Sequence, residues 1–87
     1  MKIDTDRIVN TNAGALLLAG EAAIGGGDSS FDLSGVQRCD SSAVALLLGW
    51  QRAARAQGRS LQLHAIPASL RTLAALYGVD SLIADAG

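Results

Sequence analysis

The chain has few of the residue types that carry catalytic chemistry or bind metals. Among its 87 residues there is one cysteine, Cys39, and one histidine, His64. One cysteine cannot close an internal disulfide, and these two residues with scattered carboxylates do not supply clustered metal ligands. A serine nucleophile needs a nearby base and an orienting group, and the sequence has no G-x-S-x-G motif. We therefore expect no enzymatic activity, no metal site and no cofactor.

Charge of either sign is also scarce. Seven lysines and arginines stand against eight aspartates and glutamates, which gives a net charge of -1. A chain without a positive field does not attract nucleic acid or anionic lipid over a distance. Arg52, Arg55 and Arg59 fall near one face of a predicted helix, but without interleaved aromatic residues they are more typical of a solvated face. We expect no nucleic-acid partner.

Long hydrophobic runs are missing as well. The longest, Ala13–Gly20 and Ala43–Trp50, have eight residues each, whereas a membrane-spanning helix needs about 20. The N-terminus has no secretory signal, so we expect a cytoplasmic protein that reaches a membrane only through a partner. Because 49% of the residues are apolar and only 3% are aromatic, we expect one domain over residues 1–87 with an aliphatic core.

Three consecutive glycines, Gly25 to Gly27, invite comparison with a phosphate-binding loop. The sequence has no GxxxxGK[ST] pattern, and its only lysine is Lys2, so the lysine that would hold a phosphate is missing. We interpret the glycines as a flexible connector.

Glycines, the single proline and polar clusters divide the chain into elements in the order β-β-β-α-β-α. The patterning predicts two antiparallel strands within 3–9 and 13–20, a strand over 30–34, a helix from Ser41 or Ser42 to Gln57, a strand over 61–66 and a helix over Ser69–Tyr77. Because the long helix connects the strands over 31–34 and 61–66, these two should be parallel, with a right-handed crossover.

The start of the long helix concentrates polar side chains. A helix needs one N-cap side chain, and Asp40, Ser41 and Ser42 offer three, so at least one hydroxyl is left to face solvent or a partner. On physical grounds alone, a purely structural cap and a functional loop are equally good explanations.

The two faces of this helix differ in polarity at 100 degrees per residue. One side collects Leu46, Trp50, Ala53, Ala54 and Gln57, and the other collects Gln51, Arg52 and Arg55. Val44 and Leu48 fall on the polar side, which makes a mixed surface suited to a protein partner. The alternative is that scattered surface leucines are normal and mean nothing.

The sequence resembles the STAS domains, a family named after sulphate transporters and anti-sigma-factor antagonists. The resemblance is carried by Phe31-Asp32-Leu33-Ser34, Val36 and the run from Cys39 to Leu48, which follow the pattern D-L-S-x-V-x-x-x-D-[ST]-[SG]-[GA]. It covers residues 15 to 83 with one gap. It implies an α/β fold, a STAS-like mixed β-sheet of about four strands with helices on one side.

The resemblance also implies a function. STAS domains bind other proteins and do not catalyse reactions, and the members most similar to this chain, through Gln57-Gly58 and Leu73 to Val79, serve Mla-type ABC transporters. This implies an accessory subunit that binds and regulates the transporter ATPase in phospholipid transport and outer-membrane lipid asymmetry, peripheral to the inner membrane through the transporter. The alternative is a switch of the anti-sigma-factor-antagonist type, with Ser41 as the phosphoacceptor.

Position in the motif implies a partner-binding surface. Its expected members are Asp40, Ser41, Ser42, Ala43 and Val44, to which the helix face adds Leu48 and Arg52. The chain departs from the family pattern in two ways. Ala43 stands where glycine is usual, and Ala22 to Phe31 is too short for the usual helix and return. We therefore expect the first family helix to be missing, with an exposed apolar edge that favours self-association.

Overall fold

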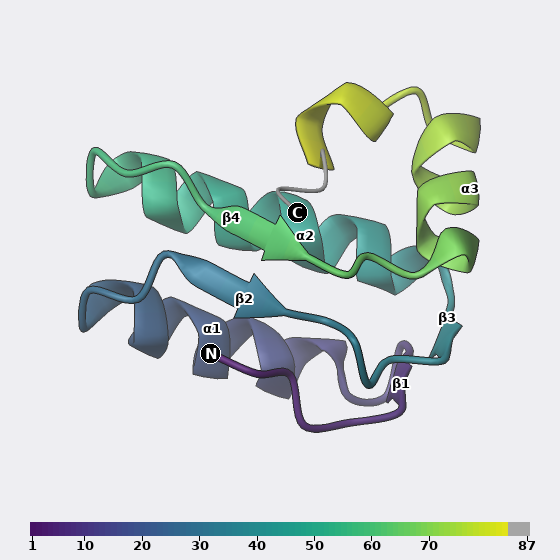
Figure 1. Cartoon of the computed structure of the whole chain (residues 1–87), viewed down its shortest axis with the longest axis horizontal. Coiled ribbons are helices and arrows are strands. Elements are labelled where there is room, and N and C mark those ends of the chain that lie inside the picture. Colours follow the sequence, from purple (N-terminus) through teal and green to yellow (C-terminus); the bar gives the residue numbers. More distant parts are fainter. Residues whose placement is uncertain (84–87) are drawn as a thin grey trace.

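The computed structural model describes residues 1–83 and shows three helices and four short strands (Figure 1). In chain order these are β1 (Arg7–Ile8), α1 (Ala13–Gly25), β2 (Ser30–Asp32), β3 (Arg38–Cys39), α2 (Ser41–Ala56), β4 (Gln62–His64), α3 (Ala68–Leu76) and the 3-10 turn η1 (Asp80–Ile83). The α/β class and the two helices predicted after residue 40 are confirmed.

The first helix corrects the sequence-based prediction. Residues 13–25 form the helix α1, so the strand predicted over 13–20 and the missing first helix are both wrong. The run rich in alanine and leucine continues past Gly20 to Ile24, and these residues favour a helix. Because α1 fills the place expected to be empty, the reason for predicting self-association disappears.

Gly20 lies inside α1 because α2 approaches very closely there. A Cβ atom on Gly20 would lie 2.0 Å from Nε1 of Trp50, and one on Gly49 would lie 2.9 Å from Cδ1 of Leu17. The indole N–H of Trp50 donates a hydrogen bond to the carbonyl oxygen of Leu16 at 3.1 Å. Gly20 therefore permits the close contact between α1 and α2, whereas a Cβ atom on Gly49 would meet only the end of the flexible Leu17 side chain.

The strands form two parallel pairs, β1 with β3 and β2 with β4. The parallel pairing predicted across the long helix is confirmed, with Phe31 opposite Leu63. The single sheet of about four strands is not formed among residues 1–83. A turn separates β2 from β3, in which the Ser34 N–H donates to Oδ1 of Asp32 at 2.8 Å and the Val36 N–H donates to the Leu33 carbonyl.

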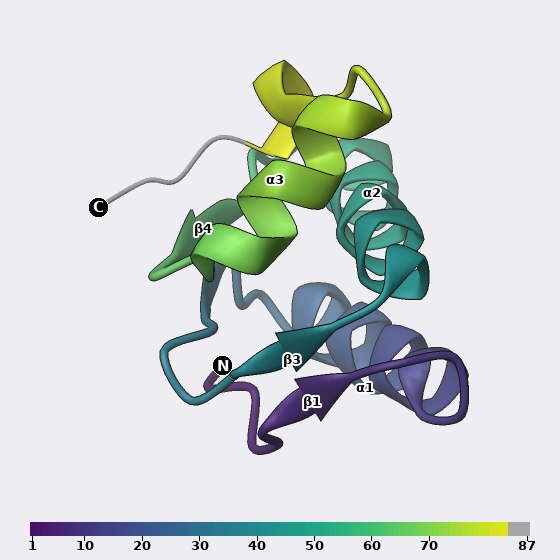
Figure 2. The same ribbon diagram turned by 90° about the vertical axis from the view of Figure 1, so that its right-hand side faces the viewer.

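Helices α1 and α2 cover the same face of the β2–β4 pair, as the two views in Figures 1 and 2 show together. The core between them contains Phe31 and Trp50, whose rings meet edge to face with centroids 4.9 Å apart. Both rings are fully buried, and so is Ala54 on the predicted core face of α2. Edge-to-face packing and burial of two aromatic rings contribute several kcal/mol to folding, at roughly 25 cal/mol per Å² of apolar surface.

The predicted exposure of Val44 is wrong. Its side chain is only 5% exposed, and Leu48 is half-buried. Helix α3 and the turn η1 pack against α2, and they cover part of the face that the sequence pattern leaves in solvent. Helix α2 thus packs against α1, against the β2–β4 pair through Phe31 and Trp50, and against α3 with η1.

Within residues 1–83, no helix is both long enough and apolar enough to cross a membrane.

Candidate functional site

The candidate site lies at Asp40, the residue between the end of β3 and the start of α2. The Asp40 carboxylate caps the helix, with Oδ1 accepting from the Ser42 N–H at 2.8 Å and also from the Ser42 hydroxyl. Its Oδ2 accepts from the N–H of Asn10 at 3.0 Å, in the turn before α1. These hydrogen bonds, with that of the Ser42 hydroxyl first, hold the pKa of the Asp40 carboxyl below its usual range.

Ser41 takes no part in the N-cap of α2. Its side chain is exposed at the first position of α2 and forms no hydrogen bond within residues 1–83. The structure therefore uses Asp40 as the cap and Ser42 as its support. The predicted free hydroxyl is present, and it belongs to Ser41.

A shallow hollow of about 350 Å³ opens beside Ser41. We call it the α2–α3 hollow, and it is lined by Ser41, Val44, Ala45, Leu48, Tyr77 and Val79. The rim is apolar and accessible, since Tyr77 is 58% exposed and its neighbour Leu76 is 77% exposed. An exposed aromatic ring beside aliphatic side chains is typical of a protein-binding surface.

The structure brings together only part of the predicted surface. Ser41, Val44 and Leu48 share the α2–α3 hollow, and Arg52 is exposed further along the helix. Ala43 is fully buried, so the prediction that it lines the contact is wrong. Its position is two residues, or about 200 degrees, away from Ser41 on the helix, which turns its side chain inward.

Sequence reasoning missed Tyr77 and Val79. They belong to the segment that leaves α3, where Gly78 adopts a positive φ of 70 degrees and the Val79 N–H donates back to the carbonyl of Ala74. This turn directs the chain over α2. The Tyr-Gly-Val sequence signals a helix end, but only the tertiary fold places it beside Ser41.

Two smaller hollows flank the same helix. One of about 190 Å³ is lined by Leu48, Gln51, Arg52 and Arg55. The other, of about 170 Å³, lies on the opposite side of Ala45 and is lined by residues of α1 and α2: Ala13, Gly14, Leu17, Ser42, Ala45 and Leu46. Ala45 therefore lines two apolar hollows, this one and the α2–α3 hollow.

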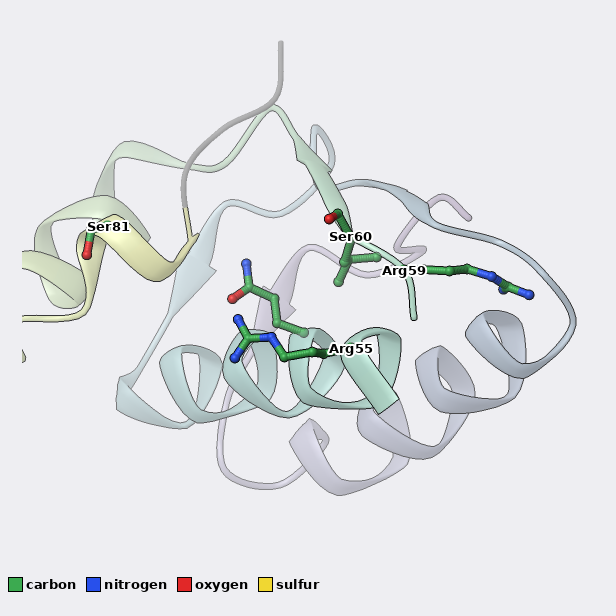
Figure 3. A pocket seen from close by; sticks show the side chains of 6 residues that line it. Arg55, Arg59, Ser60 and Ser81 are labelled. Atoms are coloured by element: carbon green, nitrogen blue, oxygen red, sulfur yellow. The ribbon is translucent and has the colours of Figure 1, made fainter. Parts of the chain in front are cut away.

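A polar hollow of about 190 Å³ lies at the C-terminal half of α2 (Figure 3). Figure 3 shows the Arg55 side chain beside this hollow and the Arg59 side chain directed away from it. The Nη1 atom of Arg59 donates to the carbonyl oxygen of Ile24 at 2.8 Å, at the C-terminus of α1, where a cation is favourable. Arg59 thus stabilises α1, and the three arginines do not act as one patch.

The described residues offer little for catalysis. Burial raises the pKa of the Cys39 thiol, which weakens it as a nucleophile. Among residues 1–83, no three histidine, cysteine, aspartate or glutamate side chains gather in a way that could hold a metal ion. The arrangement at the start of α2 is suited to binding, because it combines a free hydroxyl with an accessible apolar hollow.

The chain matches a known protein family over most of its length. Residues 6–84 match the family model described as Mlab, STAS domain. The match includes the whole of α2, the α2–α3 hollow and the strands that position them. A search of curated proteins found no match to the chain.

Proposed function

This chain belongs to the family of MlaB-type STAS domains, and we propose that it is a non-catalytic accessory subunit that binds and regulates the ATPase of an Mla-type ABC transporter. STAS domains in general are regulatory or accessory domains without catalytic activity. In this proposal the chain is cytoplasmic and reaches the inner membrane only through the transporter. The complex moves phospholipid and maintains the lipid asymmetry of the outer membrane.

The observation that carries the proposal is the position of Ser41. Its exposed hydroxyl stands at the edge of the α2–α3 hollow, next to Val44 and Leu48. A partner that fills the hollow with apolar side chains would desolvate the Ser41 hydroxyl and exchange a hydrogen bond with it. Such a combination of an apolar pocket and one polar group gives both affinity and orientation.

In this proposal the chain binds the ATPase subunit, and the ATPase subunit binds the nucleotide. The sequence has no phosphate-binding lysine loop, so in this proposal an MlaF-like ATPase subunit supplies nucleotide binding and hydrolysis. A subunit that binds one conformation of the ATPase better than another shifts the ATPase toward that conformation. Regulation therefore requires only differential binding at the α2–α3 hollow.

The test is copurification of the tagged chain with the ATPase subunit, followed by measurement of ATP hydrolysis with and without the chain. We expect Tyr77→Glu to reduce recovery of the ATPase about tenfold or more, because a charge at an exposed apolar rim opposes desolvation. Leu18→Glu is the matched control, since Leu18 is 68% exposed on α1 and lines none of the hollows described above. Equal binding by both variants, or no binding by the wild type, would reject the proposal.

One observation favours a second candidate function. The exposed Ser41 hydroxyl is not needed for the helix cap, so a phosphate could be attached to it without removing the Asp40 cap. The N-terminus of α2 attracts a phosphate and the adjacent Asp40 carboxylate repels it. This would be a phosphorylation switch of the anti-sigma-factor-antagonist type. Intact-mass spectrometry of the protein from its host, before and after phosphatase treatment, tests this directly, because an unmodified Ser41 under all growth conditions excludes the switch.

A further inference from the structure

Two of the hollows lie along α2 and meet at Leu48, and we call the two together the trough. The α2–α3 hollow and the hollow around Arg52 share Leu48. Ser41, Ala45, Leu48, Arg52 and Arg55 are spaced by three or four residues, and so they follow one stripe of the helix. At about 1.5 Å per residue this stripe is about 21 Å long, or roughly four turns.

The two ends of the trough differ in charge. Helix α2 contains no aspartate or glutamate, and the exposed Arg52 and Arg55 form no ion pair within residues 1–83. The other end is apolar around Val44 and Tyr77, and no charged side chain lines it. The trough is therefore cationic at one end only.

We infer that this trough binds an amphipathic helix of the ATPase subunit, apolar where it faces Ser41 to Leu48 and acidic where it faces Arg52 and Arg55. The inference rests on the proposed function and specifies the chemistry of the partner at the same site. A helix fits better than a strand, because the trough is lined by side chains and offers no open strand edge with which an extended peptide could pair. A helix satisfies its own backbone groups and packs about 8–10 Å from α2.

The charge distribution also fixes the direction of the bound helix. Acidic residues at the other end would be desolvated against a lining that contains no charged side chain, and a buried carboxylate without a partner opposes binding. Only one orientation places the acidic turn beside Arg52 and Arg55. The apolar end then fills the α2–α3 hollow and covers Ser41.

The experiment measures the affinity of the full chain for the ATPase subunit at about 50 mM and about 500 mM NaCl. The test variant is Arg52→Glu with Arg55→Glu. Its control is Lys2→Glu with Arg7→Glu, which makes the same change in net charge at exposed positions outside α2. A third variant, Arg52→Lys with Arg55→Lys, keeps the charge. Thermal unfolding verifies that every variant is folded.

We expect the test variant to bind about tenfold or more weakly at low salt, the control to change by less than about threefold, and the lysine variant to keep most of the affinity. Wild-type binding should weaken as salt is raised. If the wild type binds but the two charge reversals have the same effect, the acidic helix is rejected and the proposed function stands. If the wild type does not bind the ATPase at all, the proposed function itself fails.

Discussion

At the scale of single residues, the three polar side chains at the start of α2 have separate tasks. Asp40 holds the cap, Ser42 supports it, and Ser41 remains free at the rim of the α2–α3 hollow. The sequence could predict that one of the three would be free, because a helix needs only one cap. Cap chemistry alone does not identify which one, because that depends on the extended backbone of Asp40 and on its second hydrogen bond to Asn10. The resemblance to STAS domains singles out Ser41, and its side chain is exposed.

Substitutions at Ser41 should therefore affect binding and not folding. For Ser41→Ala we expect a change in the free energy of unfolding below about 1 kcal/mol, since the Asp40 cap is intact. Recovery of the ATPase should fall in the order Ser41→Thr, Ser41→Ala, Ser41→Asp. Threonine keeps the hydroxyl, alanine leaves the partner's polar group unsatisfied at a cost of about 1–3 kcal/mol, and aspartate adds a desolvated charge.

Asp40→Ala is the matched stability control for this series. Removing the carboxylate removes the cap of α2, which should lower the free energy of unfolding by about 0.5–2 kcal/mol. Chemical denaturation of Asp40→Ala and Ser41→Ala measures the difference. A loss for Ser41→Ala as large as that for Asp40→Ala would show that Ser41 is structural, and full binding by Ser41→Asp would remove it from the interface.

At the scale of elements, the sequence predicted α2 and α3 well and failed at α1. The start and stop residues of α2 are strong local signals, from Asp40 to the left-handed Gly58. The run from residue 13 to 24 is almost entirely apolar and shows no clear polar face. The spacing of its apolar residues therefore does not distinguish a helix from a strand. In the sequence Gly20 is typical of an element boundary, but in the structure its small size serves the contact with Trp50.

The tight contact between α1 and α2 gives a sharp prediction at Gly20. Gly20→Ala would place a Cβ atom 2.0 Å from the Trp50 indole, and the ring could move only by losing its hydrogen bond to Leu16. We expect a net loss of roughly 1–3 kcal/mol, because overpacking outweighs the gain of up to about 1 kcal/mol in helix propensity. Denaturation followed by fluorescence of Trp50, the only tryptophan, measures the loss.

Gly14 supplies the control on the same helix. A Cβ atom there would meet nothing within 4 Å, so Gly14→Ala should stabilise the protein by up to about 1 kcal/mol through helix propensity alone. We therefore expect Gly20→Ala to destabilise the protein and Gly14→Ala to stabilise it. If Gly20→Ala also stabilised the protein, α1 and α2 would not be packed as described.

At the scale of the whole molecule, the STAS signature predicted the family and the α/β fold correctly, and the family match extends this to residues 6–84. The α2–α3 hollow was beyond prediction, because it depends on α3 and η1 folding over α2, which brings Tyr77 and Val79 beside residues of α2 more than 20 positions earlier in the chain. Periodicity places Val44 on a polar face only if α2 is considered alone. Local patterns thus determine the elements, and the tertiary contacts decide which surface remains for a partner.

The Asp40 carboxylate connects distant parts of the molecule, since it holds the start of α2 and also the turn before α1 through Asn10. Its pKa is lowered in the folded protein, mainly by the Ser42 hydroxyl. A carboxyl with a depressed folded-state pKa stabilises the fold above its unfolded-state value of about 3.9. That stabilisation is lost as the pH falls from about 4 through the folded-state pKa.

Asp40→Asn isolates this contribution, because asparagine is also a good N-cap but does not titrate. The wild type should be more stable than Asp40→Asn at neutral pH, and the difference should shrink below about pH 4.

Asp28 and Asp32 also have lowered pKa values, through hydrogen bonds from the N-terminal amine and from the Ser34 N–H respectively. Both proteins will therefore lose stability in acid, and only the difference between their unfolding curves reports on Asp40. A difference that stays constant from pH 7 to about pH 2.5 would mean that the charge of Asp40 does not stabilise the start of α2.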